Sequence, residues 1–181
     1  HRLERPGTVM EPGGVGRLRG NADAKATPVA AYDADADAVL QWLRADPGTD
    51  SKRLGAVGFC IGGHLAFRAA FRSDVKAAAC LYPTGLQNGR LGRGSADSLQ
   101  RAQEIQGALL TVFGSEDPHV PAEAREQICS ALINLRHETL LFEANHTFMR
   151  DDGWRWDPEL ADQAWGVVMA FLRRELRSVQ L

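Results

Sequence analysis

The sequence predicts an α/β fold built on a mainly parallel sheet with helices on both faces. Four short runs are apolar at nearly every position, as expected of strands that are buried on both sides. Segments with helical periodicity alternate with these runs, which is typical of parallel strands joined by helical crossovers. The length of 181 residues is that of one domain. The runs cover residues 54–59, 76–82, 108–113 and 139–144.

The segment before the first helix, residues 1–27, is predicted to be a long loop. It is rich in glycine and proline, carries the turn signals RPGT and EPGG, and has no sustained apolar periodicity. Loops of this length are uncommon inside compact domains and often line a functional site. A second glycine-rich stretch, GRLGRGS at 89–95, is predicted to be a loop after the second strand.

Four helices are expected, one before the first strand and one after each of the first, third and fourth strands. The first is capped by Thr27, has Pro28 in its first turn and ends at the DPG of residues 46–48. The alanine-rich second helix runs to about Phe71, and Asp157 precedes the proline of the last. The predicted first residues of the later helices are Ile61, Pro121 and Pro158.

Charge and hydropathy argue against two classes of partner. The 21 basic and 23 acidic side chains give a net charge of −2, and the arginines are scattered along the chain. Because binding to phosphate needs a basic face, we expect no nucleic-acid partner. No stretch approaches the roughly 20 consecutive apolar residues that span a bilayer, so we expect no membrane partner.

The three cysteines predict neither a disulfide framework nor a structural zinc site. Cys60, Cys80 and Cys129 are odd in number, far apart, and without CxxC or Cys/His spacing. The sequence implies no metal and no cofactor. Three free thiols fit a reducing, cytoplasmic compartment best.

Cys60 is the candidate nucleophile, at the end of the first predicted strand in GFCIGGH. Residues 58–62 match G-x-S-x-G with cysteine in place of serine. Gly58 and Gly62 would leave room for a sharp turn, and the helix that starts there would aim its N–H groups at the sulfur and favour the thiolate. The Ile61 N–H would then be an oxyanion donor. The alternative is a small buried residue in a glycine-rich turn.

Two later candidates also follow strands, and ligands in open parallel sheets bind beyond the carboxyl ends of strands. Asp117 follows the third strand and could orient an imidazole, although an Asp–Pro pair is more often a turn, and Glu116 competes for the role. His146 follows the fourth strand; alone it would be read as a loop histidine, and His119 remains a competitor. The weaker histidine candidates are His1, His64 and His137.

The order of these candidates predicts their chemistry. A nucleophile, an acid and a histidine, each after a separate strand, form the arrangement of α/β-hydrolases. Cys60 would attack a carbonyl carbon, His146 would move the proton, and Asp117 would hold the tautomer of the imidazole. Water activated by His146 would then hydrolyse the acyl-thioenzyme.

The sequence also resembles the dienelactone hydrolase (carboxymethylenebutenolidase) family, through GFCIGGHLAF, GSEDPHVP and NHTFMR. The resemblance runs from roughly residue 28 to the C-terminus. It implies a single α/β-hydrolase domain, a three-layer sandwich over residues 1–181, in which a Cys-Asp-His triad acts on cyclic enol esters. It also implies that Arg150 binds a substrate carboxylate, and Arg2 is the loosely aligned match to a second such arginine.

The resemblance further implies that the N-terminal strands of the fold are missing. Complete family members have strands and a helix before the long loop, including the turn with the second oxyanion donor and a glutamate that contacts the resting thiol. Residues 1–27 lack the pattern of those strands, so residues 28–181 are expected to form the C-terminal part of the fold. An exposed sheet edge would follow, and we expect little or no esterase activity from the 181 residues alone.

The leading prediction is a cysteine-dependent hydrolase of a small ester or lactone. The alternatives are a broad carboxylesterase or thioesterase, a redox-sensing thiol, or a catalytically inactive binding domain. The sequence determines neither the exact substrate nor the oligomeric state.

Overall fold

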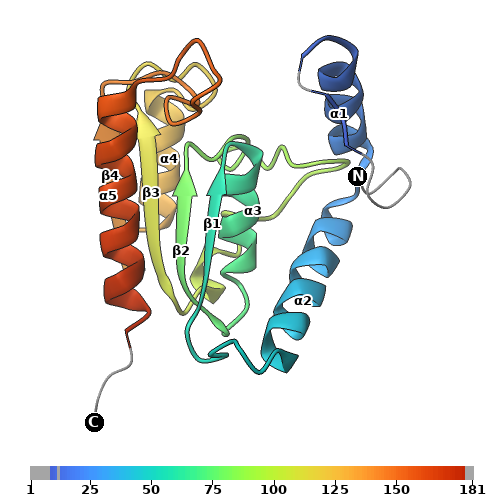
Figure 1. The fold of residues 1–181 in the computed structure, drawn as a ribbon, viewed down its shortest axis with the longest axis vertical. Coiled ribbons are helices and arrows are strands. Elements are labelled where there is room, and N and C mark those ends of the chain that lie inside the picture. Colours follow the sequence, from blue (N-terminus) through green and yellow to red (C-terminus); the bar gives the residue numbers. More distant parts are fainter. Residues whose placement is uncertain (1–8, 12, 178–181) are drawn as a thin grey trace.

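A four-stranded parallel sheet forms the centre of the computed structural model, which describes residues 9–11 and 13–177 (Figure 1). The strands lie in the order β1-β2-β3-β4, and all three pairings are parallel. The predicted parallel sheet is therefore confirmed. The strands are β1 (Leu54–Phe59), β2 (Val75–Leu81), β3 (Ala108–Gly114) and β4 (His137–Phe142).

Helices cover both faces of the sheet and give three layers. Alternate residues of β2 face opposite sides, so that Ala78 and Cys80 join the core under α2, α3 and α4, whereas Ala77 and Ala79 join the core under α5. Figure 1 shows α5 on one side of the sheet and α2 and α3 on the other. None of the described helices is long and apolar enough to cross a bilayer. These helices are α2 (Val29–Ala45), α3 (Ile61–Ala69), α4 (Ala122–Ala131) and α5 (Pro158–Glu175).

The predicted loop over residues 1–27 is wrong for its second half, which forms helix α1 (Gly14–Ala26). None of the side chains of α1 is buried, and Figure 1 shows the helix standing apart from the sheet. A helix that buries no face needs no apolar stripe, so the periodicity that reveals other helices is absent from its sequence. Arg2 lies outside the described residues.

The predicted helix caps are correct in one case and wrong in another. The Asp157 side chain accepts a hydrogen bond of 3.0 Å from the Leu160 N–H and caps α5, as predicted. Thr27 does not cap α2, because Pro28 occupies the cap position and the Thr27 hydroxyl donates to the Asp23 carbonyl at 2.7 Å, at the end of α1.

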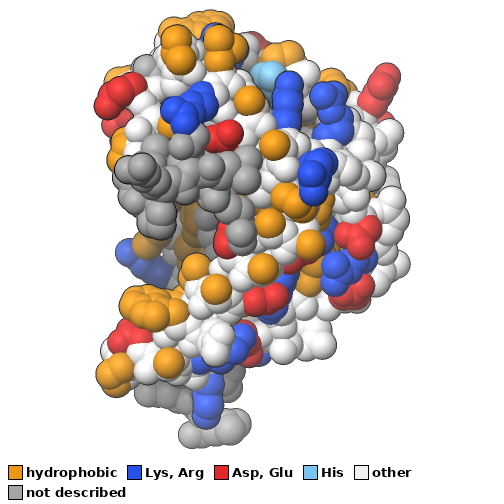
Figure 2. Space-filling view, turned by 90° about the vertical axis from the view of Figure 1, so that its right-hand side faces the viewer, with side chains coloured by type: hydrophobic (Ala, Val, Ile, Leu, Met, Phe, Trp, Pro, Cys, Tyr) orange, Lys and Arg blue, Asp and Glu red, His pale blue; other side chains and the backbone are white. Residues whose placement is uncertain are grey.

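The outer edge of β1 has no strand partner among the described residues, and apolar surface lies beside it. Val57 of β1 is 40% exposed. An open groove of about 610 Å³ runs between α2, β1 and α3, and Val39, Leu43 and Leu65 contribute to its lining. Figure 2 looks onto this side of the molecule and shows hydrophobic side chains scattered over it. An exposed edge of this kind is what the sequence led us to expect.

Candidate active site

Cys60 occupies the turn between β1 and α3 in a backbone conformation that side chains rarely adopt. Its φ is 57° and its ψ is −122°. The Cys60 N–H donates to the Leu81 carbonyl at 3.0 Å, and the Cys60 carbonyl accepts from the Gly63 N–H at 3.0 Å, so both sides of the residue are fixed. A strained strand-to-helix turn of this kind lifts a nucleophile out of the sheet.

Glycines make this turn possible, although one of them is not the glycine predicted. A Cβ atom at Gly58 would lie 1.8 Å from the Gly62 carbonyl oxygen, and one at Gly63 would lie 2.8 Å from the Leu81 carbonyl oxygen. A Cβ atom at Gly62 would meet no described atom within 4 Å. The predicted steric role of Gly62 is therefore wrong, and Gly63 has that role instead.

The structure brings the three predicted catalytic side chains into one hydrogen-bonded chain. His146 Nε2 lies 3.2 Å from Cys60 Sγ, and His146 Nδ1 lies 2.7 Å from Asp117 Oδ2. Asp117 and His146 are 2% and 4% exposed. Because a carboxylate can only accept, Nδ1 carries a proton toward Asp117 and Nε2 can exchange one with the sulfur.

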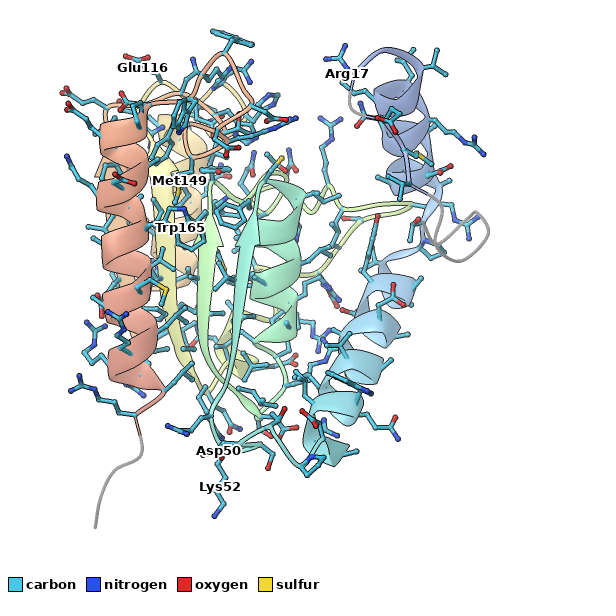
Figure 3. The ribbon with its side chains drawn as sticks, in the orientation of Figure 1. Arg17, Asp50, Lys52, Glu116, Met149 and Trp165 are labelled. Carbon is cyan, nitrogen blue, oxygen red and sulfur yellow. The ribbon has the colours of Figure 1, made fainter. Side chains whose placement is uncertain are left out.

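Among the acidic residues after β3, the geometry favours Asp117 over Glu116. Glu116 is exposed and points outward at the end of the sheet (Figure 3). Asp117 is also held by the His119 N–H, which donates to its Oδ1 at 2.8 Å. His119 itself is exposed, and its ring centroid lies 4.6 Å from that of His146. The His119 ring therefore packs against the hydrogen-bonded set of Cys60, His146 and Asp117 and does not take the place of His146.

The electrostatics of the site favour an ion pair between sulfur and imidazole. Burial alone would lower the pKa of His146, but hydrogen bonds to Asp117 and Cys60 raise it to about 9. Burial alone would raise the pKa of Cys60, but hydrogen bonds to His146 and Thr84 bring it below its usual value. Near neutral pH this combination favours thiolate beside imidazolium. Cys80 contrasts with Cys60, because full burial raises its pKa to about 12.

Ile61, for which an oxyanion role was predicted, follows Cys60 directly in the chain. Ile61 is the first residue of α3, where an N–H has no acceptor within the helix. A hydrogen bond from this N–H contributes to the lowered pKa of the Cys60 thiol. A carbonyl oxygen attached to that sulfur would therefore form close to the N–H and to the positive end of the helix dipole.

Comparison with known proteins agrees with this architecture. The model of the dienelactone hydrolase family matches residues 20–176. The chain belongs to the dienelactone hydrolase family. The predicted family resemblance and the α/β-hydrolase fold are thereby confirmed. Among the described residues of this family member, no three His, Cys, Asp or Glu side chains are grouped so that they could hold a metal ion.

The relatives of this family member are longer than the chain itself. A carboxymethylenebutenolidase of Pseudomonas putida is 30% identical over 149 residues, covering 80% of this chain and 58% of that protein. A Saccharomyces cerevisiae protein, provisionally named a carboxymethylenebutenolidase, is 33% identical over 159 residues, covering 83% and 58%. The crystal structure of a Klebsiella pneumoniae protein, provisionally named a dienelactone hydrolase, matches with a TM-score of 0.67 at 28% identity, covering 78% and 60%. The chain thus spans less than two thirds of the length of each.

Thr84 is a residue of the site that the sequence analysis missed. Its Oγ1 lies 3.7 Å from Cys60 Sγ, and its N–H donates to the Cys60 carbonyl at 3.2 Å. A single threonine in a loop matches no motif. One signal was nevertheless available, because Thr84 follows β2 at the same edge of the sheet where the other candidates follow their strands.

A polar pocket of about 240 Å³ adjoins the cysteine–histidine pair of this dienelactone hydrolase family member. Thr84 and His119 connect the two, since Thr84 contacts Cys60 and the His119 ring packs on His146. Arg90 is exposed, and its guanidinium has no hydrogen bond or ion pair with the described residues. The pocket is lined by Thr84, Gly85, Gln87, Asn88, Arg90 and His119.

Arg150, which the family resemblance assigns to the substrate carboxylate, is already paired with a carboxylate of its own loop. Its Nη2 donates to Asp152 Oδ2 at 3.0 Å, and its Nε donates to Oδ1 of the same residue. Both side chains are more than half exposed, with values of 56% and 59%. A substrate carboxylate would have to compete with Asp152 for this arginine.

Proposed function

We propose that this chain carries the catalytic residues of a hydrolase that cleaves small carboxylic esters or lactones with Cys60 as its nucleophile. One observation carries the proposal: in a strained turn, Cys60 Sγ lies 3.2 Å from His146 Nε2, and His146 Nδ1 lies 2.7 Å from Asp117. The name of the Pseudomonas putida relative, a carboxymethylenebutenolidase, supports an ester or lactone as the substrate class.

The acylation step follows from the ion pair. The Cys60 thiolate attacks the carbonyl carbon, and the π electrons of the carbonyl move to its oxygen, which accepts a hydrogen bond from the Ile61 N–H. When the intermediate collapses, the bond from carbon to the leaving oxygen breaks and the His146 imidazolium gives its proton to that oxygen. The product is a thioester on Cys60, and in a lactone the released hydroxyl stays attached to the acyl group.

The deacylation step uses the same imidazole in the opposite direction. Neutral His146 takes a proton from water as the water oxygen attacks the thioester carbon. The carbon–sulfur bond then breaks, the acid is released, and the thiolate beside the imidazolium is restored. Asp117 keeps the Nδ1 proton of His146 in place and stabilises its cationic form in both steps.

Selective alkylation tests this proposal. We expect iodoacetamide at pH 7 to label Cys60 about 10-fold or more faster than Cys129, because an ordinary thiol is only a few per cent ionised at that pH. Cys129 is the matched control, since both cysteines are partly exposed, whereas Cys80 is fully buried. Peptide mass spectrometry after timed labelling measures the rates. Equal rates for Cys60 and Cys129 would refute the activated nucleophile.

We further propose that the substrate carries a carboxylate, and the chain offers three candidate arginines for it. The resemblance favours Arg150 and, loosely, Arg2. The structure adds Arg90, whose guanidinium has no partner among the described residues and which lines the pocket that Thr84 also lines. We expect Arg90→Ala to slow acylation by p-nitrophenyl hemisuccinate about 10-fold, the effect of one hydrogen bond to a charged group. Acylation by the uncharged p-nitrophenyl acetate should hardly change.

The release of p-nitrophenolate in the first turnover measures both acylation rates, so the test does not depend on deacylation. Arg93→Ala is the control, because Arg93 is an exposed arginine of the same loop that does not line the pocket. A selective loss with the hemisuccinate in Arg150→Ala, but not in Arg90→Ala, would show that the resemblance identifies the correct arginine and that Arg90 is not the anchor.

A further inference from the structure

Helix α3 carries a row of polar residues on one face, beginning at the candidate nucleophile. Cys60 at its cap, His64 and Arg68 follow one another at intervals of four residues, which places them on the same side of the helix. His64 is 0% exposed and Arg68 is 3% exposed. Polar groups buried this deeply need hydrogen-bond partners, and the segment that follows β2 provides them.

His64 joins two residues of that segment. Its Nδ1 lies 3.2 Å from the Thr84 carbonyl oxygen, and its Nε2 lies 2.7 Å from Ser98 Oγ. Because a carbonyl can only accept, Nδ1 carries the proton and Nε2 accepts from the Ser98 hydroxyl. Burial lowers the pKa of His64 to about 4, so this neutral form persists throughout the neutral range.

Arg68 anchors the outer end of this row. Its Nη1 donates to Ser98 Oγ at 3.0 Å and to Asp97 Oδ1 at 2.9 Å. It also donates to both carboxylate oxygens of Asp33 in α2, at 2.9 and 2.6 Å. Bidentate pairs of this kind fix a guanidinium in position, and the Ser98 hydroxyl is therefore held against His64.

Thr84 stands at the inner end, where three of its groups are engaged. Its carbonyl accepts from His64, its N–H donates to the Cys60 carbonyl, and its hydroxyl lies 3.7 Å from the Cys60 sulfur. The first two bonds fix the backbone that carries the hydroxyl. A thiolate has no proton to donate, so the hydroxyl must be the donor in this contact.

We propose that Thr84 is a catalytic residue whose hydroxyl donates to the Cys60 thiolate, and that His64, held by Ser98 and Arg68, is the positioning residue that keeps Thr84 there. The inference rests on the proposed function in taking Cys60 as the nucleophile. The effect of the Thr84 hydroxyl can nevertheless be measured without any ester, from the rate at which the Cys60 sulfur is alkylated.

The pH dependence of alkylation separates this role from general damage to the fold. In Thr84→Val, which has nearly the same shape, we expect the midpoint of Cys60 alkylation to rise by about half to one pH unit. At pH values below the midpoint, Cys60 of Thr84→Val should therefore be alkylated more slowly than Cys60 of the unchanged chain. A thiolate of higher pKa is intrinsically more nucleophilic, so the rate at alkaline pH should equal or exceed that of the unchanged chain. Damage to the fold would lower the rate at every pH.

Two further variants serve as matched controls. Thr84→Ser keeps the hydroxyl and should restore the original midpoint. Thr139→Val removes a hydroxyl that lies 3.6 Å from a different sulfur, that of Cys129, and should leave the profile of Cys60 unchanged. Cys80 reports on folding in every sample, because it is fully buried and should resist labelling as long as the chain is folded.

The positioning role of His64 is tested by a double-mutant cycle. His64→Leu removes the bond to the Thr84 carbonyl, and we expect it to shift the Cys60 midpoint in the same direction as Thr84→Val. The two changes together should shift the midpoint no further than Thr84→Val alone, because both act through the same contact, the one between the Thr84 hydroxyl and the Cys60 sulfur. If labelling of Cys80 shows that His64→Leu is unfolded, His64→Asn, which retains an N–H donor near the Nδ1 position, should keep the original midpoint.

Opposite results would overturn the inference. An unchanged midpoint in Thr84→Val, with Cys60 still reacting faster than Cys129, would reject the role of Thr84 and leave the proposed function intact. Fully additive shifts in the double variant, or a shifted midpoint in a folded His64→Asn, would reject the positioning role of His64. If Cys60 of the unchanged chain reacts no faster than Cys129, the proposed function itself fails, and the Thr84 role fails with it.

Discussion

Replacing Cys60 with alanine is expected to slow acylation by p-nitrophenyl acetate by at least about 10³-fold, the scale of loss seen when a nucleophile is removed from a hydrogen-bonded catalytic set. Among the described residues, no other sulfur is hydrogen-bonded to the His146 imidazole; Cys80 is fully buried and Cys129 contacts Thr139. The first-turnover release of p-nitrophenolate and the mass of the acylated peptide measure the loss.

Two controls make this result specific. Cys129→Ala removes another partly exposed thiol and should acylate normally. Cys60→Ser keeps a polar atom near the sulfur position but should still acylate slowly, because a hydroxyl does not ionise beside the imidazole at neutral pH. Normal acylation of Cys60→Ala would place the nucleophile elsewhere in the chain.

The parts of the fold that could be predicted are those in which burial leaves a pattern in the sequence. β3 is buried at every position, so its apolar run marks it almost to the residue. Helix α1 buries no side chain, and its sequence accordingly carries no stripe. The same reason explains the misplaced cap, since the Thr27 hydroxyl bonds to the end of a helix that was not foreseen.

The residues of the candidate site likewise fall into those that the sequence reveals and those that it does not. Cys60, Asp117 and His146 could be found because each lies just beyond the end of a recognisable strand, and the parallel sheet brings those ends together. Thr84 and Ser98 belong to the segment between β2 and β3. Apart from the position of Thr84 just after β2, no local pattern encodes the fold of that segment, on which their roles depend. His64 looked like an ordinary helix residue, and only its spacing of four from Cys60 placed it on the same helical face.

The second large effect is expected on replacing His146 with alanine. Burial raises the pKa of Cys60, and the hydrogen bond and charge of His146 lower it, together with hydrogen bonds from Thr84 and Ile61. Without His146 that burial effect is opposed only by the weaker donors, so the pKa of the thiol should rise by about 1–3 units. The midpoint of the pH profile of Cys60 alkylation should therefore move to higher pH. Its rate, measured between pH 5 and 10, gives the midpoint directly.

His119→Ala is the matched control for this change, because His119 packs its ring on His146 but bonds to Asp117 only through its backbone. We expect its midpoint to stay close to that of the unchanged chain. A larger shift in His119→Ala than in His146→Ala would identify His119 as the base and reject the hydrogen-bonded chain as the working arrangement.

Alkaline pH separates the two tasks proposed for His146. Above its raised midpoint, Cys60 of His146→Ala is ionised without help, so acylation by an activated ester should recover much of its rate. Deacylation should not recover, because the attacking water still lacks a base, a loss of about 10²–10⁴-fold. The acyl-thioester should therefore accumulate on Cys60 and be visible by mass spectrometry. If His146→Ala instead turned over the ester as fast as the unchanged chain, hydrolysis would not depend on His146, and its proposed role as the base would be rejected.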